Sequence, residues 1–494
     1  MTQNATHDHQ VPTRLMHVGG EWVDSLAGQR RDILNPARRG EVIARVPQAE
    51  AADVDRAVLV ARRAFPAWRD QHFKARQLAL LKAADAIEER ADELARVTAL
   101  DTGNALRTQA RPEVATLVDL FRYFGGVAGE VKGTTLPAGA GQLQYTRHEP
   151  LGVVGAILPW NSPLMIAGFK VPAALAAGNT MVLKAAEDAP LSILLLAEIL
   201  ATALPAGVLN VITGEGATAG AALVEHPDID KISFTGSTPV GRGIGRIAGE
   251  KLRHVSLELG GKNPSIVFPG QVTDELIEGL LISSRVHRQG QSCTAGSRLF
   301  LHREVHDEVV ARLSQRLRDQ VVGDPSEEQT DIGAIINDKQ FTSVRGYIED
   351  GLANPALHLE AGGLPPAEGP LSEGYFHLPT LFSGGDNSFR LAREEIFGPV
   401  VVAIPWTDVD DVVAMANDSA YGLAAYVWSN DVNLAISTAH RLEAGWVQVN
   451  QGGGQVVGQS YGGYKQSGIG REVSLEGMIA GFTQTKQVNI KITG

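Results

Sequence analysis

The chain has 494 residues, of which 44% are hydrophobic and 20% charged, and its formal net charge is −12. A chain of this length is too long for a single hydrophobic core, so we predict two or three domains. The negative charge argues against nucleic acid as a partner, and no polybasic patch is present for a membrane surface. A single cysteine excludes an internal disulfide and a thiolate metal cluster, so we expect a reduced thiol in a cytoplasmic protein.

The first fifteen residues are polar and lack the basic-then-apolar plan of a signal peptide, so we expect a frayed tail there. Short strands are expected at 18–23 and 33–34. Over 75–100, apolar residues recur every three or four positions and predict one amphipathic helix that ends at Asp101-Thr102-Gly103. The expected buried face of this helix consists of Leu78, Leu81, Ala84, Ile87, Ala91 and Leu94.

Strands and helices alternate from residue 151 to residue 260. The apolar run 151–158 predicts a buried parallel strand, which brings Pro159-Trp160-Asn161 to the carboxyl end where open α/β sheets bind ligands. Strands at 180–184, 208–213 and 231–235, with helices at 191–204 and 217–225 between them, predict a doubly wound parallel sheet. The run 191–204 is shorter than the roughly 20 residues that span a bilayer. Segment 236–241 opens the next helix directly after a strand, which suits pyrophosphate binding but also describes a plain strand-to-helix turn.

The same alternation continues beyond residue 261. Helices are expected at 273–286, 304–321, 407–417 and 432–442, and strands at 297–302, 424–428 and 446–450. His302 and His306 are four residues apart but lack the HExxH pattern, so we expect no metal site. The Gly-rich segment 451–470 predicts a long functional loop. Alternation over 134–148 predicts a strand or hairpin away from the helical body, and alternation over 484–492 predicts an edge strand that pairs with a partner subunit.

The only cysteine, Cys293, lies in Gln289-Gly290-Gln291-Ser292-Cys293-Thr294-Ala295-Gly296. A lone cysteine is more often a small buried hydrophobe than a nucleophile. Here glycines and hydroxyl residues on both sides suit a tight backbone that carries a reachable thiol, whose neighbouring N–H groups stabilise a thiolate or an oxyanion. The residues alone leave both interpretations open.

Glu258 is an acid between two leucines at the end of an apolar run. A carboxyl group in such surroundings is a candidate general base with a raised pKa. The alternative is an outward-facing residue on an alternating strand, since Ser256, Glu258 and Gly260 share one face.

These two stretches and four others, in the same order, resemble the NAD(P)-dependent aldehyde dehydrogenase superfamily. The resemblance extends from about Gly19 to the C-terminus. The six family-like segments are Pro159-Trp160-Asn161-Ser162-Pro163, Phe234-Thr235-Gly236-Ser237-Thr238, Leu257-Glu258-Leu259-Gly260-Gly261-Lys262, Gly290-Gln291-Ser292-Cys293, Glu394-Glu395-Ile396-Phe397-Gly398-Pro399 and Gly462-Gly463-Tyr464-Lys465.

The resemblance implies an α/β fold of two doubly wound parallel-sheet domains, one Rossmann-like for the cofactor and one catalytic, with a small β oligomerisation arm. We expect the NAD-binding domain at 1–129 and 150–260, the catalytic domain at 261–480, and the arm at 130–149 and 481–494. The family's homodimer or homotetramer is expected with it.

In the family mechanism the thiolate of Cys293 adds to the aldehyde first, because a free carbonyl carbon does not release hydride at useful rates. The resemblance implies that the Asn161 side chain and the Cys293 backbone N–H hold the oxyanion. It also implies that Glu258 activates the water that hydrolyses the thioester. Without the resemblance, Asn161 is typical of a turn residue before Ser162-Pro163.

The resemblance also implies NAD as cofactor. Lys184 and Glu187 match positions that hold the adenosine ribose, and a carboxylate at 187 would repel a 2′-phosphate, which favours NAD over NADP. A solvated ion pair is the alternative for these two residues. Ala185 stands where most members have proline. The expected cofactor-binding residues are Ile157, Trp160, Lys184, Glu187, Gly220, Gly236, Ser237, Gly241, Glu395 and Phe397.

The substrate is expected to be a small-molecule aldehyde. The pocket residues we expect are apolar or neutral, which favours an aromatic or aliphatic aldehyde, while Arg288, where many relatives have asparagine, keeps a semialdehyde with a second carboxylate open. Glu472 matches an acid that some relatives tie to a proton relay. The expected pocket residues are Met165, Phe169, Ser292, Thr294 and the loop 451–461.

Three other functions compete with this one. A coenzyme A-acylating relative would transfer the acyl group instead of hydrolysing it, and Glu258 argues against it. A cysteine hydrolase needs a histidine base, and none of the thirteen histidines lies in a recognisable partner motif. A non-catalytic structural relative would have no reason to keep Cys293, Glu258 and Asn161 together.

Overall fold

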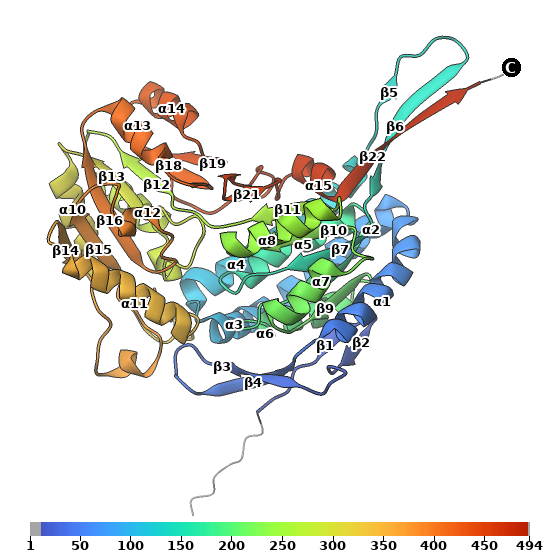
Figure 1. Ribbon diagram of the computed structural model, residues 1–494, viewed down its shortest axis with the longest axis horizontal. Coiled ribbons are helices and arrows are strands. Elements are labelled where there is room, and N and C mark those ends of the chain that lie inside the picture. Colours follow the sequence, from blue (N-terminus) through green and yellow to red (C-terminus); the bar gives the residue numbers. More distant parts are fainter. Residues whose placement is uncertain (1–10, 493–494) are drawn as a thin grey trace, which may run out of the picture.

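Five parallel strands lie at the centre of the first sheet in the computed structural model, which describes residues 11–492 (Figure 1). Three of them are largely aliphatic and buried, whereas the strands 231–235 and 254–258 alternate apolar and polar residues. Two short antiparallel strands close one edge and one closes the other. In spatial order the eight strands are β2 (Glu21–Val23), β1 (Met16–Val18), β9 (Leu209–Ile212), β8 (Thr180–Lys184), β7 (Val153–Ile157), β10 (Lys231–Thr235), β11 (His254–Glu258) and β21 (Gly468–Ile469).

Helices cover both faces of this sheet. One face packs against α1 (Ala51–Arg69), α7 (Ala221–Glu225) and α8 (Thr238–Glu250). The other packs against α5 (Pro163–Ala176), α6 (Leu191–Ala201) and α15 (Leu475–Phe482), and behind these lie α2 (Phe73–Glu89), α3 (Ala91–Thr102) and α4 (Arg111–Gly126).

The second sheet has six parallel strands and one antiparallel edge strand. Its spatial order is β14 (Leu357–Ala361), β15 (Thr380–Gly384), β16 (Val400–Trp406), β13 (Arg298–His302), β12 (Pro264–Val267), β18 (Ala424–Trp428) and β19 (Trp446–Val449). One face contacts α9 (Asp274–Ser283) and α10 (His306–Arg318), and the other contacts α11 (Asp338–Ala353), α12 (Arg390–Arg393), α13 (Val409–Asn417) and α14 (Val432–Arg441). The predicted fold class, two doubly wound parallel-sheet domains, is confirmed.

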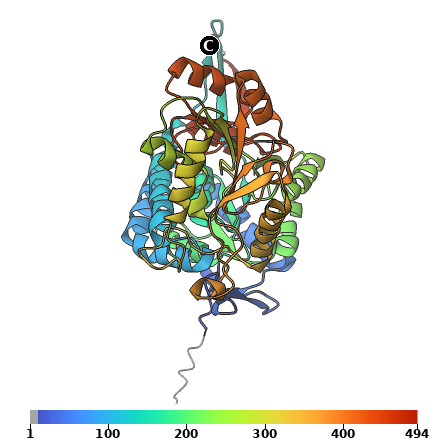
Figure 2. The same ribbon diagram turned by 90° about the vertical axis from the view of Figure 1, so that its left-hand side faces the viewer.

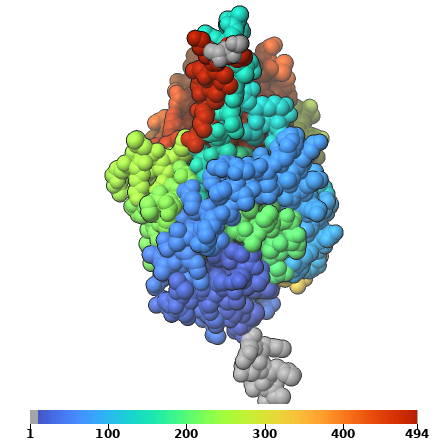
Figure 3. Space-filling model, turned by 90° about the vertical axis from the view of Figure 1, so that its right-hand side faces the viewer, coloured from blue at the N-terminus to red at the C-terminus, as the bar shows by residue number. Residues whose placement is uncertain are grey.

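A three-stranded antiparallel arm extends from the domain of the first sheet, as Figure 1 and Figure 2 show from two directions. It consists of β5 (Thr135–Leu136), β6 (Gln142–Pro150) and β22 (Thr483–Lys491). β22 pairs with β6 along its whole length and is an outer strand, so its prediction as an edge strand is confirmed. Figure 3 shows these two strands side by side on the surface of the arm. Two smaller pairs complete the sheets: β3 (Arg30–Leu34) with β4 (Val42–Pro47), and β17 (Tyr421–Gly422) with β20 (Tyr464–Lys465).

The chain order of the first sheet creates a crevice at one point. From β7 the chain proceeds to β8 and β9 on one side and then returns to place β10 on the other side of β7. The segments that leave the carboxyl ends of β7 and β10 therefore diverge, and ligands of open α/β sheets bind at such a point. The predicted segments 159–161 and 236–241 follow these two strands.

Two predictions near the N-terminus are wrong. Residues 1–10 of the expected tail lie outside the described residues, but the next ones are not frayed, because Arg14 N–H donates to the Arg45 carbonyl oxygen at 2.9 Å and Arg45 N–H donates to that of Pro12 at 2.9 Å. The expected single helix over 75–100 is two helices that meet at Arg90, whose φ of −112° and ψ of 23° are not helical. The apolar spacing continues across this break, although Leu78 is 60% exposed.

The last part of the predicted catalytic domain returns to the first sheet. β21 pairs with β11 through Leu257 and Glu258, and α15 packs against α5. Apart from this return, the limits of the NAD-binding domain, the catalytic domain and the arm stay predictions. None of the helices within residues 11–492 is long and apolar enough to cross a membrane.

Candidate active site

A cavity of about 870 Å³ lies at the carboxyl ends of the first sheet's strands, and the second domain closes it. Its wall contains eleven of the thirteen residues predicted for catalysis or cofactor binding. These eleven are Ile157, Trp160, Asn161, Lys184, Glu187, Gly236, Ser237, Glu258, Cys293, Glu395 and Phe397.

The other two predicted residues, Gly220 and Gly241, are buried behind the wall. A side chain at Gly241 would overlap Leu259, so this glycine allows α8 to approach the segment after β11. Gly220 ends a π-helical turn (Gly216–Gly220) before α7, and Gly216 of that turn faces the cavity in its place. The expected pocket residues Met165, Phe169, Ser292 and Thr294 also line the cavity, together with Gly454, Gln455 and Tyr461 from the Gly-rich loop.

Cys293 lies on a strained loop after a 3₁₀ turn (Val286–Arg288). Gln289 and Gly290 have φ values of 51° and 64°, and a side chain at Gly290 would overlap the Gly398 carbonyl group. The thiol is partly buried, and its sulfur lies 3.7 Å from the Tyr461 hydroxyl oxygen. Burial raises the pKa of the thiol from 9.0 to about 11, while the hydrogen bond with Tyr461 acts in the opposite direction.

A five-residue linker joins the two domains and holds the Glu258 end of β11 against the thiol loop. The Asn263 side-chain amide donates to the carbonyl oxygens of Cys293 and Ala295 at 2.8 and 2.9 Å. Glu395 accepts from Gly261 N–H at 2.9 Å, and Arg298 donates to the Lys262 carbonyl oxygen at 2.9 Å. These residues of the second domain therefore fix the linker backbone.

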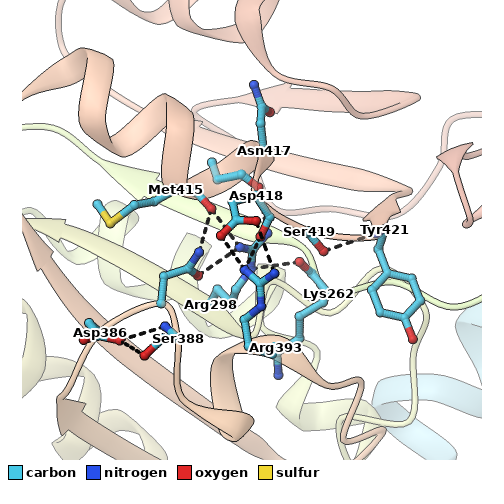
Figure 4. Close-up of polar contacts among 12 residues, drawn as sticks. Lys262, Arg298, Asp386, Ser388, Arg393, Met415, Asn417, Asp418, Ser419 and Tyr421 are labelled. Carbon is cyan, nitrogen blue, oxygen red and sulfur yellow. Dashed lines mark hydrogen bonds and ion pairs between the residues drawn. The ribbon is translucent and has the colours of Figure 1, made fainter.

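Arg298 extends this anchoring into the second domain. Figure 4 shows its guanidinium among backbone carbonyl oxygens, beside the ion pair of Arg393 and Asp418. Arg298 is 1% exposed and donates to the carbonyl oxygens of Met415 and Ala416 at 3.1 and 2.8 Å. Such a group positions the linker and lies away from the cavity wall.

Glu258 is the last residue of β11 and is 4% exposed. Neither of its carboxyl oxygens has a hydrogen-bond partner among the described residues. Burial, followed by repulsion from Glu472, raises its pKa well above the ordinary value, and Lys170 and Arg471 offset this in part. The outward-facing alternative is therefore wrong, and the raised pKa makes the Glu258 carboxylate a stronger proton acceptor than an exposed one.

Asn161 lies four residues beyond the end of β7, with its side chain directed toward the thiol loop. Its side-chain amide donates one N–H to the Gln291 carbonyl oxygen at 2.8 Å, and the Asn161 backbone carbonyl oxygen accepts from the Asn104 side chain at 3.0 Å. One N–H of the side chain remains for a ligand. The Cys293 backbone N–H also has no acceptor among residues 11–492. Two donors are therefore available at the cavity wall.

The opposite end of the cavity carries features that fit a dinucleotide. The Lys184 ammonium group is buried and donates to a Glu187 carboxylate oxygen at 2.9 Å. Burial raises the pKa of Glu187, but the charge and hydrogen bond of Lys184, a backbone hydrogen bond and the charge of Arg31 together lower it below its ordinary value, so this carboxylate is charged. Gly236 and Ser237 precede the first turn of α8, whose unsatisfied N–H groups face this region.

Glu395 and Phe397 also line the cavity. Burial raises the pKa of Glu395 to about 7, and its Oε1 accepts from Gly261 N–H. Phe397 has a φ of 53°, and its ring meets that of Trp160 edge to face at 5.3 Å between centroids. The strained backbone places an aromatic ring in the wall where a planar ring of a ligand can pack.

Sequence reasoning named Glu472 but missed its partner Lys170, and it also missed Glu113. Lys170 and Glu472 form a buried ion pair at 2.8 Å, and Lys170 also donates to Ser233 at 3.1 Å. Glu113 accepts from the backbone N–H groups of Leu164 and Met165 at 2.8 and 3.1 Å. The partners in these contacts are 302, 51 and 52 residues apart, so the sequence contains no local signal for them.

The fold and the cavity define a two-domain α/β enzyme in which a dinucleotide-type crevice opens onto a thiol, a carboxyl group and an amide. Comparison with known proteins agrees with this class. Residues 22–488 match the aldehyde dehydrogenase family. The chain belongs to that family, and it is therefore an oxidoreductase that takes NAD(P) and small-molecule aldehydes.

Relatives cover almost the whole chain. A hydroxyisobutyraldehyde dehydrogenase of Mycolicibacterium austroafricanum is 40% identical over 100% of this chain and 97% of its own length. The mitochondrial aldehyde dehydrogenase family 2 member B4 of Arabidopsis thaliana is 42% identical over 94% of this chain and 86% of its own. An NAD⁺ complex of an aldehyde dehydrogenase from Bacillus cereus has a TM-score of 0.94 and 39% identity, with 97% of each chain covered.

Proposed function

We propose that the protein oxidises an aldehyde to the carboxylic acid with NAD, using Cys293 as nucleophile, Asn161 as oxyanion donor and Glu258 as general base. The single observation that supports this most is the meeting of these three side chains in one cavity wall, from three separate segments of the chain. Each has chemistry free for use: a reachable thiol, an unshared amide N–H and a carboxyl group without a partner.

The thiolate of Cys293 adds to the carbonyl carbon, and the new oxyanion accepts from the Asn161 side chain and the Cys293 backbone N–H. NAD, when bound, supplies the acceptor for the hydride that leaves this carbon. The acyl group then remains on the sulfur as a thioester. Glu258 takes a proton from water, the hydroxide adds to the thioester carbon, and the carbon–sulfur bond breaks to give the carboxylic acid and the thiolate.

The residues at the other end of the cavity fit NAD. Lys184 and Glu187 are proposed to hold the adenosine ribose, since a charged carboxylate suits the 2′-hydroxyl and opposes a 2′-phosphate. Gly236 and Ser237, at the start of α8, are proposed for the pyrophosphate. Glu395 and Phe397 are proposed for the nicotinamide ribose and ring, and Ile157 and Trp160 for the remaining wall.

A cysteine hydrolase is disfavoured by the only histidine in the cavity wall of the described chain. His287 lies beside Arg285 and Arg288, and burial, followed by repulsion from these two cations, lowers its pKa to about 3. Such an imidazole is a weak proton acceptor at neutral pH. Glu258, with its raised pKa, is the better base, and it also argues for hydrolysis over transfer to coenzyme A.

NADH formation from a panel of aromatic, aliphatic and carboxylated aldehydes tests the proposal. Cys293→Ala is expected to abolish it. Glu258→Gln is expected to keep one rapid turnover, with NADH equal to the amount of enzyme, and then to stop at the thioester. Turnover by Cys293→Ala would remove the nucleophile assignment, and a steady rate in Glu258→Gln would remove the role of the base. If the native protein forms no NADH with any of the aldehydes, the result would support a non-catalytic relative.

We also propose a cytoplasmic homodimer or homotetramer. The single cysteine must stay reduced for the chemistry above, which suits a reducing compartment. The outer edge of β22 has unpaired backbone groups and nearby exposed apolar side chains such as Ile490, which support pairing with a second copy. Sedimentation of the native chain against one truncated before β22 tests the second proposal.

A further inference from the structure

The wall of the cavity contains two arginines that have no carboxylate within 4.0 Å in the part of the chain that the structure describes. Arg285 is satisfied by neutral oxygens, because it donates to Thr294, Tyr426 and the Gly453 carbonyl group at 3.3, 3.3 and 2.7 Å. The guanidinium of Arg288 makes one hydrogen bond among the described residues, to the Ser162 hydroxyl at 3.3 Å. Most of the donors of the Arg288 guanidinium are therefore free.

The acid that acts most strongly on Arg288 cannot serve as its full partner. Glu113 uses one carboxyl oxygen for the N–H groups of Leu164 and Met165 at the start of α5, and its other oxygen has no partner among the described residues. Burial also raises the pKa of Glu113 to about 7, so part of its population is neutral. A largely buried guanidinium without a paired anion is costly, and a ligand anion would compensate it.

Arg288 lies on the aldehyde side of the cavity. Its hydrogen-bond partner Ser162 follows Asn161 directly and precedes α5, which contributes Met165 and Phe169 to the wall. It stands five residues before Cys293 on the same loop, and its charge acts on both Cys293 and Tyr461. Lys184 and Glu187, proposed for the adenosine ribose, belong to the segment after β8 and not to this group.

We propose that Arg288 binds a carboxylate at the far end of the aldehyde substrate, so that the preferred substrates are aldehydes with a second, anionic group on a short apolar body. A guanidinium accepts a carboxylate through two parallel N–H donors, which also fixes the direction of the substrate. Met165, Phe169 and Tyr461 provide the apolar surface between the two ends. This inference rests on the proposed aldehyde oxidation and specifies its substrate.

The experiment compares substrates of the same shape and different charge. The pairs are 4-carboxybenzaldehyde with 4-formylbenzamide, and the semialdehydes of succinate and adipate with their amides. The native enzyme is expected to favour the acid of at least one pair in kcat/KM by about 10- to 100-fold, the usual range for a charged hydrogen-bonded pair. Arg288→Gln is expected to lose this preference, because kcat/KM for the acid should fall much further than kcat/KM for the amide.

Two variants serve as controls. Arg288→Lys keeps the charge without the two-donor geometry and is expected to restore part of the preference. Arg345→Gln changes an exposed arginine of α11, which pairs only with Glu349, and is expected to behave as the native enzyme. Calorimetric binding of terephthalate to Cys293→Ala, and its loss in Cys293→Ala/Arg288→Gln, gives a readout without turnover.

The possible outcomes distinguish a failure of the carboxylate site from a failure of the proposed aldehyde oxidation. Equal kcat/KM for acid and amide in the native enzyme would overturn the carboxylate site and leave aldehyde oxidation standing. Equal loss of both substrates in Arg288→Gln would also overturn it, since Arg288 would then act on the thiol. Oxidation of none of the aldehydes, with terephthalate still bound, would overturn the proposed function alone.

Discussion

The state of the Cys293 thiol can be measured without interference, because no other cysteine is present among the 494 residues. Burial raises its pKa from 9.0 to about 11. At pH 8 the thiolate fraction is then about one in a thousand, against about one in ten for an ordinary thiol. We therefore expect alkylation by iodoacetamide to be about a hundredfold slower than in the urea-unfolded chain at pH 8.

The dependence of the Cys293 alkylation rate on pH tests this expectation. The alkylation rate of the native enzyme without NAD is expected to rise without a plateau through pH 10, whereas that of the unfolded chain should reach half its maximum near pH 9 and begin to level off by about pH 10. Tyr461→Phe removes the hydroxyl that lies 3.7 Å from the sulfur and lowers the thiol pKa, so its profile should shift to higher pH. Cys293→Ala, which should not react, is the blank. A plateau near pH 8.5 in the folded enzyme would refute the burial argument, and an unchanged profile in Tyr461→Phe would refute the role of the hydroxyl.

Three further predictions concern cofactor choice and stability. Glu187→Gln removes the charge that opposes a 2′-phosphate, and the ratio of kcat/KM for NADP to that for NAD should rise by about tenfold; an unchanged ratio would exclude Glu187 from the ribose site. Glu472→Gln breaks the buried pair with Lys170 and should lower stability by about 3–5 kcal/mol, seen as a fall in Tm, whereas Lys170→Met/Glu472→Leu should lose less than the two single changes together. Burial raises the pKa of Asp101 to about 7, so the folded chain keeps a proton that the unfolded chain has released, and stability falls as pH rises from about 4 to about 7. Asp101→Asn should flatten the dependence of Tm on pH in that range, and a slope equal to that of the native protein would contradict this.

The strands could be predicted from the sequence because their apolar runs are bounded by turns. Thr180–Lys184, Lys231–Thr235 and Ala424–Trp428 were predicted with the same limits that the structure has. The break at Arg90 could not be predicted, since the two helices on either side bury one continuous apolar stripe and no glycine or proline interrupts it. β21 has only two residues in a Gly-rich segment, which is too short for any periodic signal.

The candidate site could likewise be predicted only in part from the sequence. Cys293, Glu258 and Asn161 stand in motifs, so the sequence could select them together. The surroundings that set their properties come from contacts across the fold, such as Tyr461 against the sulfur and Glu472 near Glu258. The charge balance of Arg288 likewise depends on where Glu113 points, and the sequence alone left its role open.

The linker after Glu258 has a consequence for exchanging parts between enzymes. Glu258 ends a strand of one domain and Cys293 belongs to the other, and their separation depends on contacts that Asn263, Glu395 and Arg298 make with residues 261–295. A chimaera that joins the first domain of this chain to the second domain of a relative would retain every reactive group. It would still work poorly unless the crossover left these anchors matched, so recombination is expected to succeed at the tip of the arm and to fail between Glu258 and Cys293.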